Sequence, residues 1–525
     1  MATSVRSGMT TWQRLTRRQW SFLAAGVVFG IAQILYMGTL WLHSALAGKE
    51  VHLKPITVTT DLGKMFRGLE VAVGKLLGIH TSIYGATTDG IASTGGAFVP
   101  GIGWPIVGMA IGGAIVAFAE REHRSWVKYP LRLLGVSFLG GVVFSYGTRL
   151  AGGCTLNHLL GGIPMMSIHS TVTVVFMALG GAAAFFLMTK LGLGKYFKHQ
   201  ETRSYCEATD SGECPTYDVG YRWYRNPWYW VGAAFTVALF LVAVVGGLFD
   251  PEGLRHLDGG ELVAFSKSVA AKGWLYVLGT LFAGIVAGVA MAKSGFGTEC
   301  ALVSLEAAGS MKKKDGFYAR LGIPRITRTL MRGYLPVIGI AAAWVVTGAF
   351  IWVGWSLGAQ PGFEGSVKYQ LTAGSIIGGF LLGLGAVMLI GCEIRSYMRL
   401  GMGYLNTLIG FIGFAVGYLP FTLFYEGHTS FLENTVLIDE YKWYQLLAPD
   451  SEPTQRIIYL VWVLLLAVFL FWLLRRGAAN VGVPVHDLRR LNTEELELAI
   501  DARAQDGTVG GVPAPEPVPG AHSLR

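Results

Sequence analysis

Ten long apolar segments determine what this chain can fold into. A helix that crosses a lipid bilayer needs about 20 mostly apolar residues, and ten segments meet or approach that length. Only 14% of the 525 residues are charged, whereas soluble proteins average about 25%. The segments are 20–41, 101–119, 133–150, 171–188, 228–248, 274–292, 334–355, 371–390, 405–424 and 457–474. The sequence therefore predicts an all-α polytopic membrane protein with about ten transmembrane helices.

Basic residues gather in every second connection between these segments. Cytoplasmic loops of membrane proteins carry the excess of Lys and Arg. The basic positions are Arg14, Arg17, Arg18, Arg121, Arg124, Lys128, Arg132, Lys195, Lys198, Arg203, Arg222, Arg225, Lys312, Lys313, Lys314, Arg320, Arg325, Arg328, Arg332, Arg475 and Arg476. With ten crossings all of them fall on one side, so we expect a multi-pass inner-membrane protein with both termini cytoplasmic. The net charge of +9 reflects these loops, and no nucleic acid partner is predicted.

The spans and loops divide the chain into parts. These are a cytoplasmic N-terminus (1–19), the core of a first transmembrane repeat (20–189), a cytoplasmic loop (190–227), the fifth span of that repeat (228–248), an external loop (249–273), a second transmembrane repeat (274–474) and a largely disordered cytoplasmic tail (475–525). Between the first two spans, Leu62, Phe66, Leu69 and Val73 recur at helical spacing. They predict an amphipathic helix that either lies at the membrane interface or packs on the bundle.

The two halves of the chain resemble each other at one offset of 238 residues. The matched positions are Gly140, Gly141, Gly147, Gly153 and Cys154 in the first half and Gly378, Gly379, Gly385, Gly391 and Cys392 in the second. A second offset of 258 residues aligns Gly26 and Gly30 with Gly284 and Gly288. Because each half holds an odd number of spans, the second half is inverted in the membrane. The expected architecture is two inverted five-helix repeats, which is typical of transporters.

Three of the five cysteines stand where an apolar span stops at glycines and polar side chains follow. Glycine permits close backbone approach and unusual torsions, and non-helical backbone is tolerated at membrane depth only where it is buried or lines a cavity. We therefore expect three re-entrant Gly-Cys loops that place thiols on a substrate pathway. The pathway residues are Gly153, Cys154, Thr155, Asn157, His158, Gly297, Thr298, Cys300, Gly391 and Cys392.

A thiol is a small, soft side chain with a weak S–H donor. It can hydrogen-bond a sulfur-containing anion without trapping it, and weak sites in series let an ion enter and leave. Cysteine is also commonly buried as an apolar residue, but three cysteines at Gly-rich breaks favour a function. Thiolates with His43 or His158 would suit a soft metal, yet the sequence has no CxxC motif and no Cys–His pair at ligand spacing. No metal or cofactor is predicted.

These motifs resemble the YeeE/YedE family of sulfur-transport membrane proteins. The resemblance rests on the duplicated apolar halves, the Gly-Gly-Cys motif at Cys154 and the Gly-rich segment that ends in Cys300, and it covers roughly residues 20–474. It implies uptake of thiosulfate or a related inorganic sulfur or selenium species. It also implies that Cys154, Cys300 and Cys392 contact the passing ion in turn.

Two acidic residues depart from the pattern of that family. Glu299 and Glu393 adjoin pathway cysteines, and a carboxylate beside an anion path raises the energy of the anion unless it is paired, protonated or turned away. Arg395 or Arg399 is available to pair with Glu393. Arg149 ends its span, where it either binds a carbonyl or attracts anions at the outer mouth.

Two further functions are compatible with the sequence. A membrane sulfurtransferase would form a persulfide on one cysteine, but it needs a cation beside the thiolate, and Glu299 and Glu393 argue against that. A membrane subunit would instead dock a soluble partner through the loop 190–226. Cys206 and Cys214 in this loop are expected to be reduced thiols, or to pass sulfur to a soluble cytoplasmic carrier. The leading prediction is a non-enzymatic importer of thiosulfate or a similar small anion.

Overall fold

The computed structural model describes residues 19–46, 48, 50–78, 103–119, 125–127, 131–194, 217–219, 265–295, 297, 313–323, 325–362, 364 and 366–505. The predicted span 228–248 lies outside these ranges. Among the cysteines and candidate site residues named above, the same is true of Cys206, Cys214, Thr298, Glu299 and Cys300.

Long apolar helices account for most of the described chain. Eight of them have the length and composition to cross a membrane. They are α3 (Phe22–Leu46), α7 (Leu131–Leu150), α8 (Ile168–Lys190), α12 (Phe265–Ala292), α16 (Leu335–Ser356), α17 (Ala373–Met388) continued by α18 (Glu393–Met402), α19 (Leu405–Leu423) and α22 (Glu452–Val481). The shorter apolar helix α6 (Trp104–Ala119) covers the predicted span 101–119. Each of these helices covers a predicted segment, which confirms a multi-pass α-helical membrane protein.

One side of α22 shows why these helices need a membrane. Its exposed apolar side chains include Ile457, Val461, Leu464, Val468 and Phe471. They recur at intervals of three and four residues, so they share one face of the helix. An uninterrupted apolar stripe of this length has no favourable partner in water but is matched by lipid chains.

Short elements connect the long helices. They are β1 (His52–Leu53), α4 (Thr59–Leu76), β2 (Ser125–Val127), the π-helix η2 (Leu156–Gly162), β3 (Tyr217–Val219), α14 (Asp315–Arg320), α15 (Arg325–Arg332), β4 (Gln360–Pro361), the 3-10 helix η5 (Val367–Tyr369), β5 (Leu371–Thr372), α20 (Tyr425–Asn434), β6 (Val436–Ile438), α21 (Trp443–Leu447), α23 (Val485–Arg490) and α24 (Thr493–Gln505). The strands form two-stranded pairs only: β1 with β4 in parallel, and β2 with β3 and β5 with β6 in antiparallel orientation.

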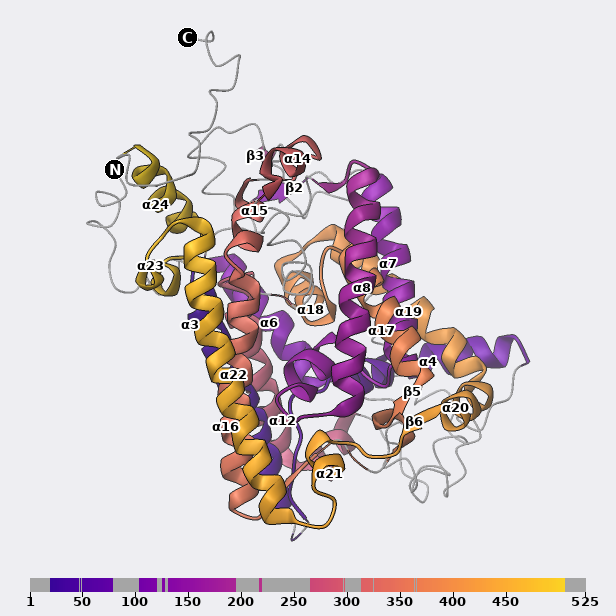
Figure 1. The fold of residues 1–525 in the computed structure, drawn as a ribbon. Helices are drawn as coiled ribbons and strands as arrows, with labels where there is room; N and C mark the ends of the chain where they lie inside the picture. Colours follow the sequence, from indigo (N-terminus) through magenta and orange to yellow (C-terminus); the bar gives the residue numbers. More distant parts are fainter. Residues whose placement is uncertain are drawn as a thin grey trace.

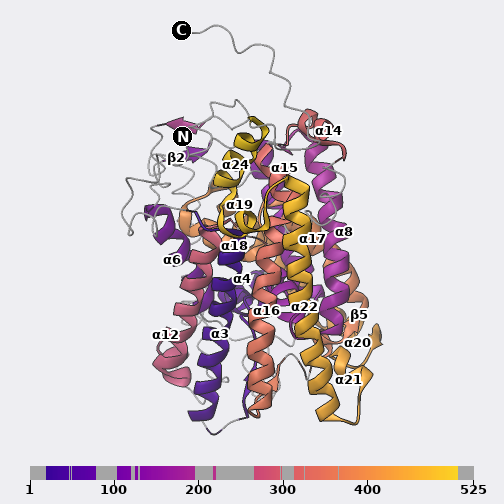
Figure 2. The same cartoon turned by 60° about the vertical axis from the view of Figure 1, so that its left-hand side comes forward.

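The helices form two groups with a short pair between them (Figure 1). In one group α3 packs against α12 and α16, and α16 packs against α22. In the other group α17 packs against α7 and α8, and α7 packs against α19. The short helices α6 and α18 contact each other and α12, and in the rotated view α6 lies at the left edge above α12 with α18 nearer the centre (Figure 2). The breaks that carry the cysteines therefore point toward the centre of the protein.

Helix α4 corresponds to the amphipathic helix predicted between the first two spans. Leu62 and Phe66 are 1% exposed, and the Phe66 ring centroid lies 5.4 Å from that of Phe411. The Tyr418 hydroxyl donates a hydrogen bond to the Thr59 carbonyl oxygen over 3.2 Å. Of the two alternatives, packing on the bundle is therefore correct for the first half of this helix.

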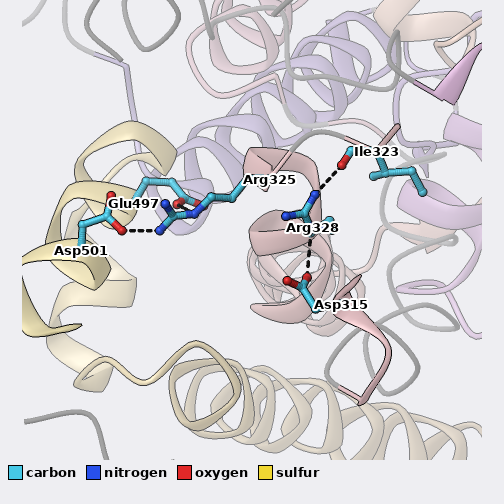
Figure 3. A network of polar contacts seen from close by, with 6 residues as sticks. All are labelled: Asp315, Ile323, Arg325, Arg328, Glu497 and Asp501. Carbon is cyan, nitrogen blue, oxygen red and sulfur yellow. Dashed lines mark hydrogen bonds and ion pairs between the residues drawn. The ribbon is translucent and has the colours of Figure 1, made fainter. Parts of the chain in front are cut away.

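Ion pairs connect the C-terminal helix α24 to α15 (Figure 3). Arg325 Nε lies 3.0 Å from Glu497 Oε2, and Arg325 also pairs with Asp501. Glu497 is fully buried, whereas Arg325 keeps 32% of its side chain exposed. Beside them Arg328 donates to Asp315 over 2.9 Å and to the Ile323 carbonyl over 2.6 Å. The tail was expected to be largely disordered, and its described part, which ends at Gln505, is ordered and helical.

Removing the cation of this pair is expected to release α24. The Arg325→Gln variant leaves Glu497 buried without its cation, which costs about 1–3 kcal/mol. We expect a protease to cut within α24 several times faster than in the wild type. The matched control is Arg456→Gln, which breaks an exposed pair with Glu452 that contributes only about 0.3–0.5 kcal/mol. Equal cleavage rates for both variants would contradict this role of Arg325.

Candidate functional site

The two described Gly-Cys breaks have the same backbone geometry. Gly153 N donates to the Thr148 carbonyl over 3.0 Å, and Gly391 N donates to the Ala386 carbonyl over 3.0 Å. The residue before each of these glycines is left-handed, with φ of 71° at Gly152 and 56° at Ile390. A helix that ends on such a residue satisfies its last carbonyls and turns sharply. The offset of 238 residues thus relates hydrogen bonds and torsions as well as sequence.

Each break is followed at once by a new helix. Cys392 has extended torsions at the N-cap position of α18, and Cys154 precedes the π-helix η2. The backbone bond from His158 N to the Cys154 carbonyl, 3.0 Å, is matched by the bond from Ser396 N to the Cys392 carbonyl, 2.8 Å. Both cysteines therefore sit between the end of one helix and the start of the next.

The motifs of Cys154 and Cys392 meet in the buried core, and we call the two cysteines and Glu393 the cysteine cluster. Both cysteines are 0% exposed, and neither forms a disulfide. The Cys154 thiol donates to Asn157 Oδ1 over 3.6 Å and also interacts with the side chain of Glu393. Because Glu393 follows Cys392 directly, the two cysteine motifs meet around this carboxyl group.

Glu393 is held in place by groups other than the arginines considered above. It is 0% exposed, and its Oε1 accepts a hydrogen bond from the Tyr397 hydroxyl. Arg399 instead donates to the Ile390 carbonyl, and among the described residues neither Arg395 nor Arg399 contacts the carboxyl. The expected pairing of Glu393 with Arg395 or Arg399 is therefore wrong: the carboxyl accepts from Tyr397, and Arg399 is engaged by the Ile390 carbonyl.

Arg149 lies beside the cluster with part of its guanidinium unsatisfied. It stacks over the Tyr418 ring, 4.2 Å from the centroid, and interacts electrostatically with Glu393 and Lys368. Its Nε and Nη2 are buried and have no hydrogen-bond partner within the described ranges. Since buried donors are normally paired, these two are available to an acceptor that the described residues do not supply.

Further polar atoms around Cys154 share this property. Thr155 Oγ1 and His158 Nε2 are buried without a partner in the described part of the chain, while His158 Nδ1 lies 3.2 Å from Ser170 Oγ. A Cβ at Gly153 would come within 3.1 Å of His158 Nε2. The absence of a side chain at Gly153 thus keeps room next to these atoms.

Some residues of this site carry no signal in the sequence. Thr59 and Asp61 from the start of α4 interact with Cys154 and Glu393, respectively. Tyr397 and Tyr418 add hydroxyl groups from α18 and α19. The spacing of these four residues along the chain matches no motif. The one usable signal in the sequence was at α4, where polar residues stand at the start of a predicted amphipathic helix.

The third predicted motif is seen only in part. Gly297 is buried, and Thr298, Glu299 and Cys300 are outside the described residues. Across the ranges that the structure describes, no group of three or more His, Cys, Asp or Glu side chains could hold a metal ion.

Comparison with known proteins places this architecture among membrane transporters. The profile of the family described as Sulphur transport matches residues 1–183 and 324–500, which is more than half of the chain. A curated relative, the thiosulfate transporter TsuA of Spirochaeta thermophila, is 33% identical over 79 residues. These residues are 15% of this chain and 24% of that protein, so the match spans about a quarter of the relative.

Proposed function

Because this chain belongs to the Sulphur transport family, we propose that it imports thiosulfate or a related small sulfur-containing anion through the bilayer. One observation carries the proposal: the breaks after α7 and α17, each with a buried cysteine, meet at Glu393, which follows Cys392 in the chain and interacts with the Cys154 thiol. Uptake of labelled thiosulfate by vesicles that contain the purified protein tests it.

The chemistry of the cluster suits an anion with sulfur and oxygen atoms. The thiols of Cys154 and Cys392 are weak donors to a soft sulfur atom. The unsatisfied Nε and Nη2 of Arg149 and the Oγ1 of Thr155 can donate to oxyanion atoms. The start of α18 behind Cys392 adds a favourable helix dipole. Donors of moderate strength hold the ion briefly, as passage requires.

We further propose that the chain is an inverted repeat, a view that the contacts between α7 and α17 support. A Cβ at Gly140 would lie 3.1 Å from the Gly385 carbonyl oxygen, and one at Gly147 would lie 3.0 Å from that of Gly378. These are reciprocal contacts between matched positions of two antiparallel helices. A two-fold axis produces reciprocal contacts of this kind, and an axis in the membrane plane inverts one half.

The other matched glycines also support the repeat. Gly26 of α3 abuts the backbone of Gly339 in α16, with a Cβ distance of 2.0 Å to its carbonyl oxygen. Likewise, Gly284 of α12 packs against the backbone of Pro105 in α6, where an added Cβ would lie 2.4 Å from the Pro105 carbonyl oxygen. The two halves would then contribute α3 with α16 and α12 with α6 as equivalent pairs.

Cys300 and the orientation complete the proposal. We place Cys300 on the same path as a third thiol, on the basis of its Gly-rich motif and the buried Gly297. We place both termini in the cytoplasm of an inner-membrane protein. The start of α3 and the C-terminal segment lie together, since Asn492 Nδ2 donates to the Gln19 carbonyl over 3.4 Å.

Replacing Arg149 is expected to weaken recognition of the anion. The Arg149→Gln variant loses a charged donor beside Cys154, so we expect the KM for thiosulfate uptake to rise about tenfold, as for a lost hydrogen bond to a charged group. Arg149→Lys keeps the charge but lacks the planar pair of donors. Its KM is expected to lie between that of the wild type and that of Arg149→Gln.

A matched control lies on the same helix. Arg132 at the other end of α7 is exposed and donates to the Leu191 carbonyl over 3.4 Å, so Arg132→Gln is expected to leave the KM unchanged. A KM for Arg149→Gln equal to that of the wild type would show that Arg149 does not contact the anion.

A further inference from the structure

Glu393 is a carboxyl group at the point where the two cysteine motifs meet. Its side chain is 0% exposed, it accepts a hydrogen bond from Tyr397, and it interacts with the Cys154 thiol. Its Oε2 has no hydrogen-bond partner among the residues that the structure describes. A negative charge at this place repels any anion that passes the cysteines.

A carboxyl beside an anion path can be turned away from it, paired with a cation or protonated. The structure excludes the first two of these states for Glu393. A turned-away carboxyl would not interact with the Cys154 thiol, whereas Glu393 does. A paired carboxyl would accept from a guanidinium or ammonium group, but no described Arg or Lys donates a hydrogen bond to it. The third way is a proton on the carboxyl, which a buried carboxyl with no ion-pair partner favours.

Among the described residues, the charged and titratable groups that face Glu393 come from α4, α7, α18, α19 and the break at Cys154. Arg149 of α7 and the first turn of α18 itself favour its ionised form. Asp61 of α4 opposes it. Tyr397 of α18 and Tyr418 of α19 supply hydroxyls, and Cys154 supplies the thiol. Of the other helices on α18, α6 has no titratable residue, and Tyr276 of α12 faces Asp61 and Tyr36. The surroundings therefore include groups that favour each of the two protonation states.

We infer that Glu393 takes up a proton when an anion occupies the cysteine cluster, so that the transporter carries a proton together with the anion. This inference rests on the proposed transport function. In the empty site Arg149 and the start of α18 offset part of the cost of burying the carboxylate, so the acid can lose its proton. When an anion arrives, its charge drives the carboxylate to bind a proton from the external side, and the acid releases that proton to the cytoplasm after the anion has left. No covalent bond to the anion forms, and the only atom that moves with it is the proton.

The coupling follows from reciprocity. If the anion raises the proton affinity of Glu393, the proton raises the affinity of the site for the anion by the same factor. Each proton carried also removes one unit from the net negative charge that crosses the membrane. A carboxyl at the point where the two cysteine motifs meet, which has no role in simple anion recognition, thus gains a function in driving uptake.

The test uses vesicles that contain the full-length protein and a pH indicator in the lumen, with the voltage clamped at zero by potassium and valinomycin. When labelled thiosulfate is added to the wild type, we expect the label to enter and the lumen to acidify in step. In Glu393→Gln, which resembles the protonated acid, we expect labelled thiosulfate to enter without acidification and at a rate independent of external pH. The control Glu497→Gln changes a buried carboxyl in α24 and is expected to acidify the lumen like the wild type.

The outcomes separate this inference from the proposed function. Uptake by the wild type without acidification overturns proton coupling and leaves thiosulfate transport intact. Acidification that persists in Glu393→Gln shows that the proton travels elsewhere and also overturns the inference. Absence of uptake by the wild type refutes the proposed function itself. If Glu393→Gln does not fold, the wild-type acidification alone decides whether a proton accompanies the anion.

Discussion

Thiosulfate uptake is expected to fall about tenfold to a hundredfold when Cys154 or Cys392 is replaced by alanine. A hydrogen bond to a charged group contributes about 1.5–3 kcal/mol, and each 1.36 kcal/mol in a barrier changes a rate about tenfold. Both thiols are fully buried in one cluster, so alanine removes the donor without opening the site to water. The measurement is the initial rate of labelled thiosulfate uptake per amount of reconstituted protein.

Two controls separate loss of the thiol from general damage. Cys154→Ser keeps a small donor of similar size and is expected to retain more activity than Cys154→Ala. The double variant Cys206→Ser, Cys214→Ser changes thiols of the loop 190–227 and is expected to transport like the wild type. If Cys154→Ala and Cys392→Ala both transport at the wild-type rate while folded, the cysteine pathway is excluded.

The second large effect concerns the fold. Gly383→Ala is expected to prevent stable assembly, because the new Cβ would lie 1.9 Å from the Met177 carbonyl oxygen of α8. The backbone of α8 can make room for this Cβ only if α17 and α8 move apart. The substitution is therefore expected to destabilise the protein by about 3 kcal/mol or more. The measurements are the amount of monodisperse protein in detergent and the midpoint of its thermal unfolding.

The matched control is the same substitution at an open position. Gly135 lies on α7 with nothing within 4 Å of its missing Cβ. Gly135→Ala is therefore expected to stabilise the helix by about 0.5–1 kcal/mol. If Gly383→Ala unfolds at the temperature of the wild type, the close approach of α8 and α17 is not required for the fold.

The long helices were predictable because the bilayer imposes one strong rule. A span must be apolar over its whole length, and this property can be read from composition alone. Predicted segments such as 334–355 and 405–424 therefore match α16 and α19 closely. The ends of α22 extend beyond the predicted segment because polar residues such as Glu452 and Asn480 continue the helix outside the apolar region.

The candidate site was only half predictable. Glycine and cysteine at a span end mark a break in the sequence itself, so Cys154 and Cys392 were identified. The contacts of Thr59, Tyr397 and Tyr418 arise from segments that meet only after folding. The partner of Glu393 was mispredicted for the same reason. Neighbours along a helix such as Arg395 suggest pairing, but the direction of each side chain is set by its position around the helix axis.

The central claim is that this protein moves a thiosulfate-like anion past the cluster of Cys154 and Cys392. Its most direct test is the initial uptake of labelled thiosulfate, next to labelled sulfate, by vesicles that contain the purified wild-type protein. The account predicts that thiosulfate accumulates above the level of empty vesicles, that excess unlabelled thiosulfate suppresses this uptake, and that sulfate enters more slowly. Thiosulfate uptake no greater than that of empty vesicles would contradict it.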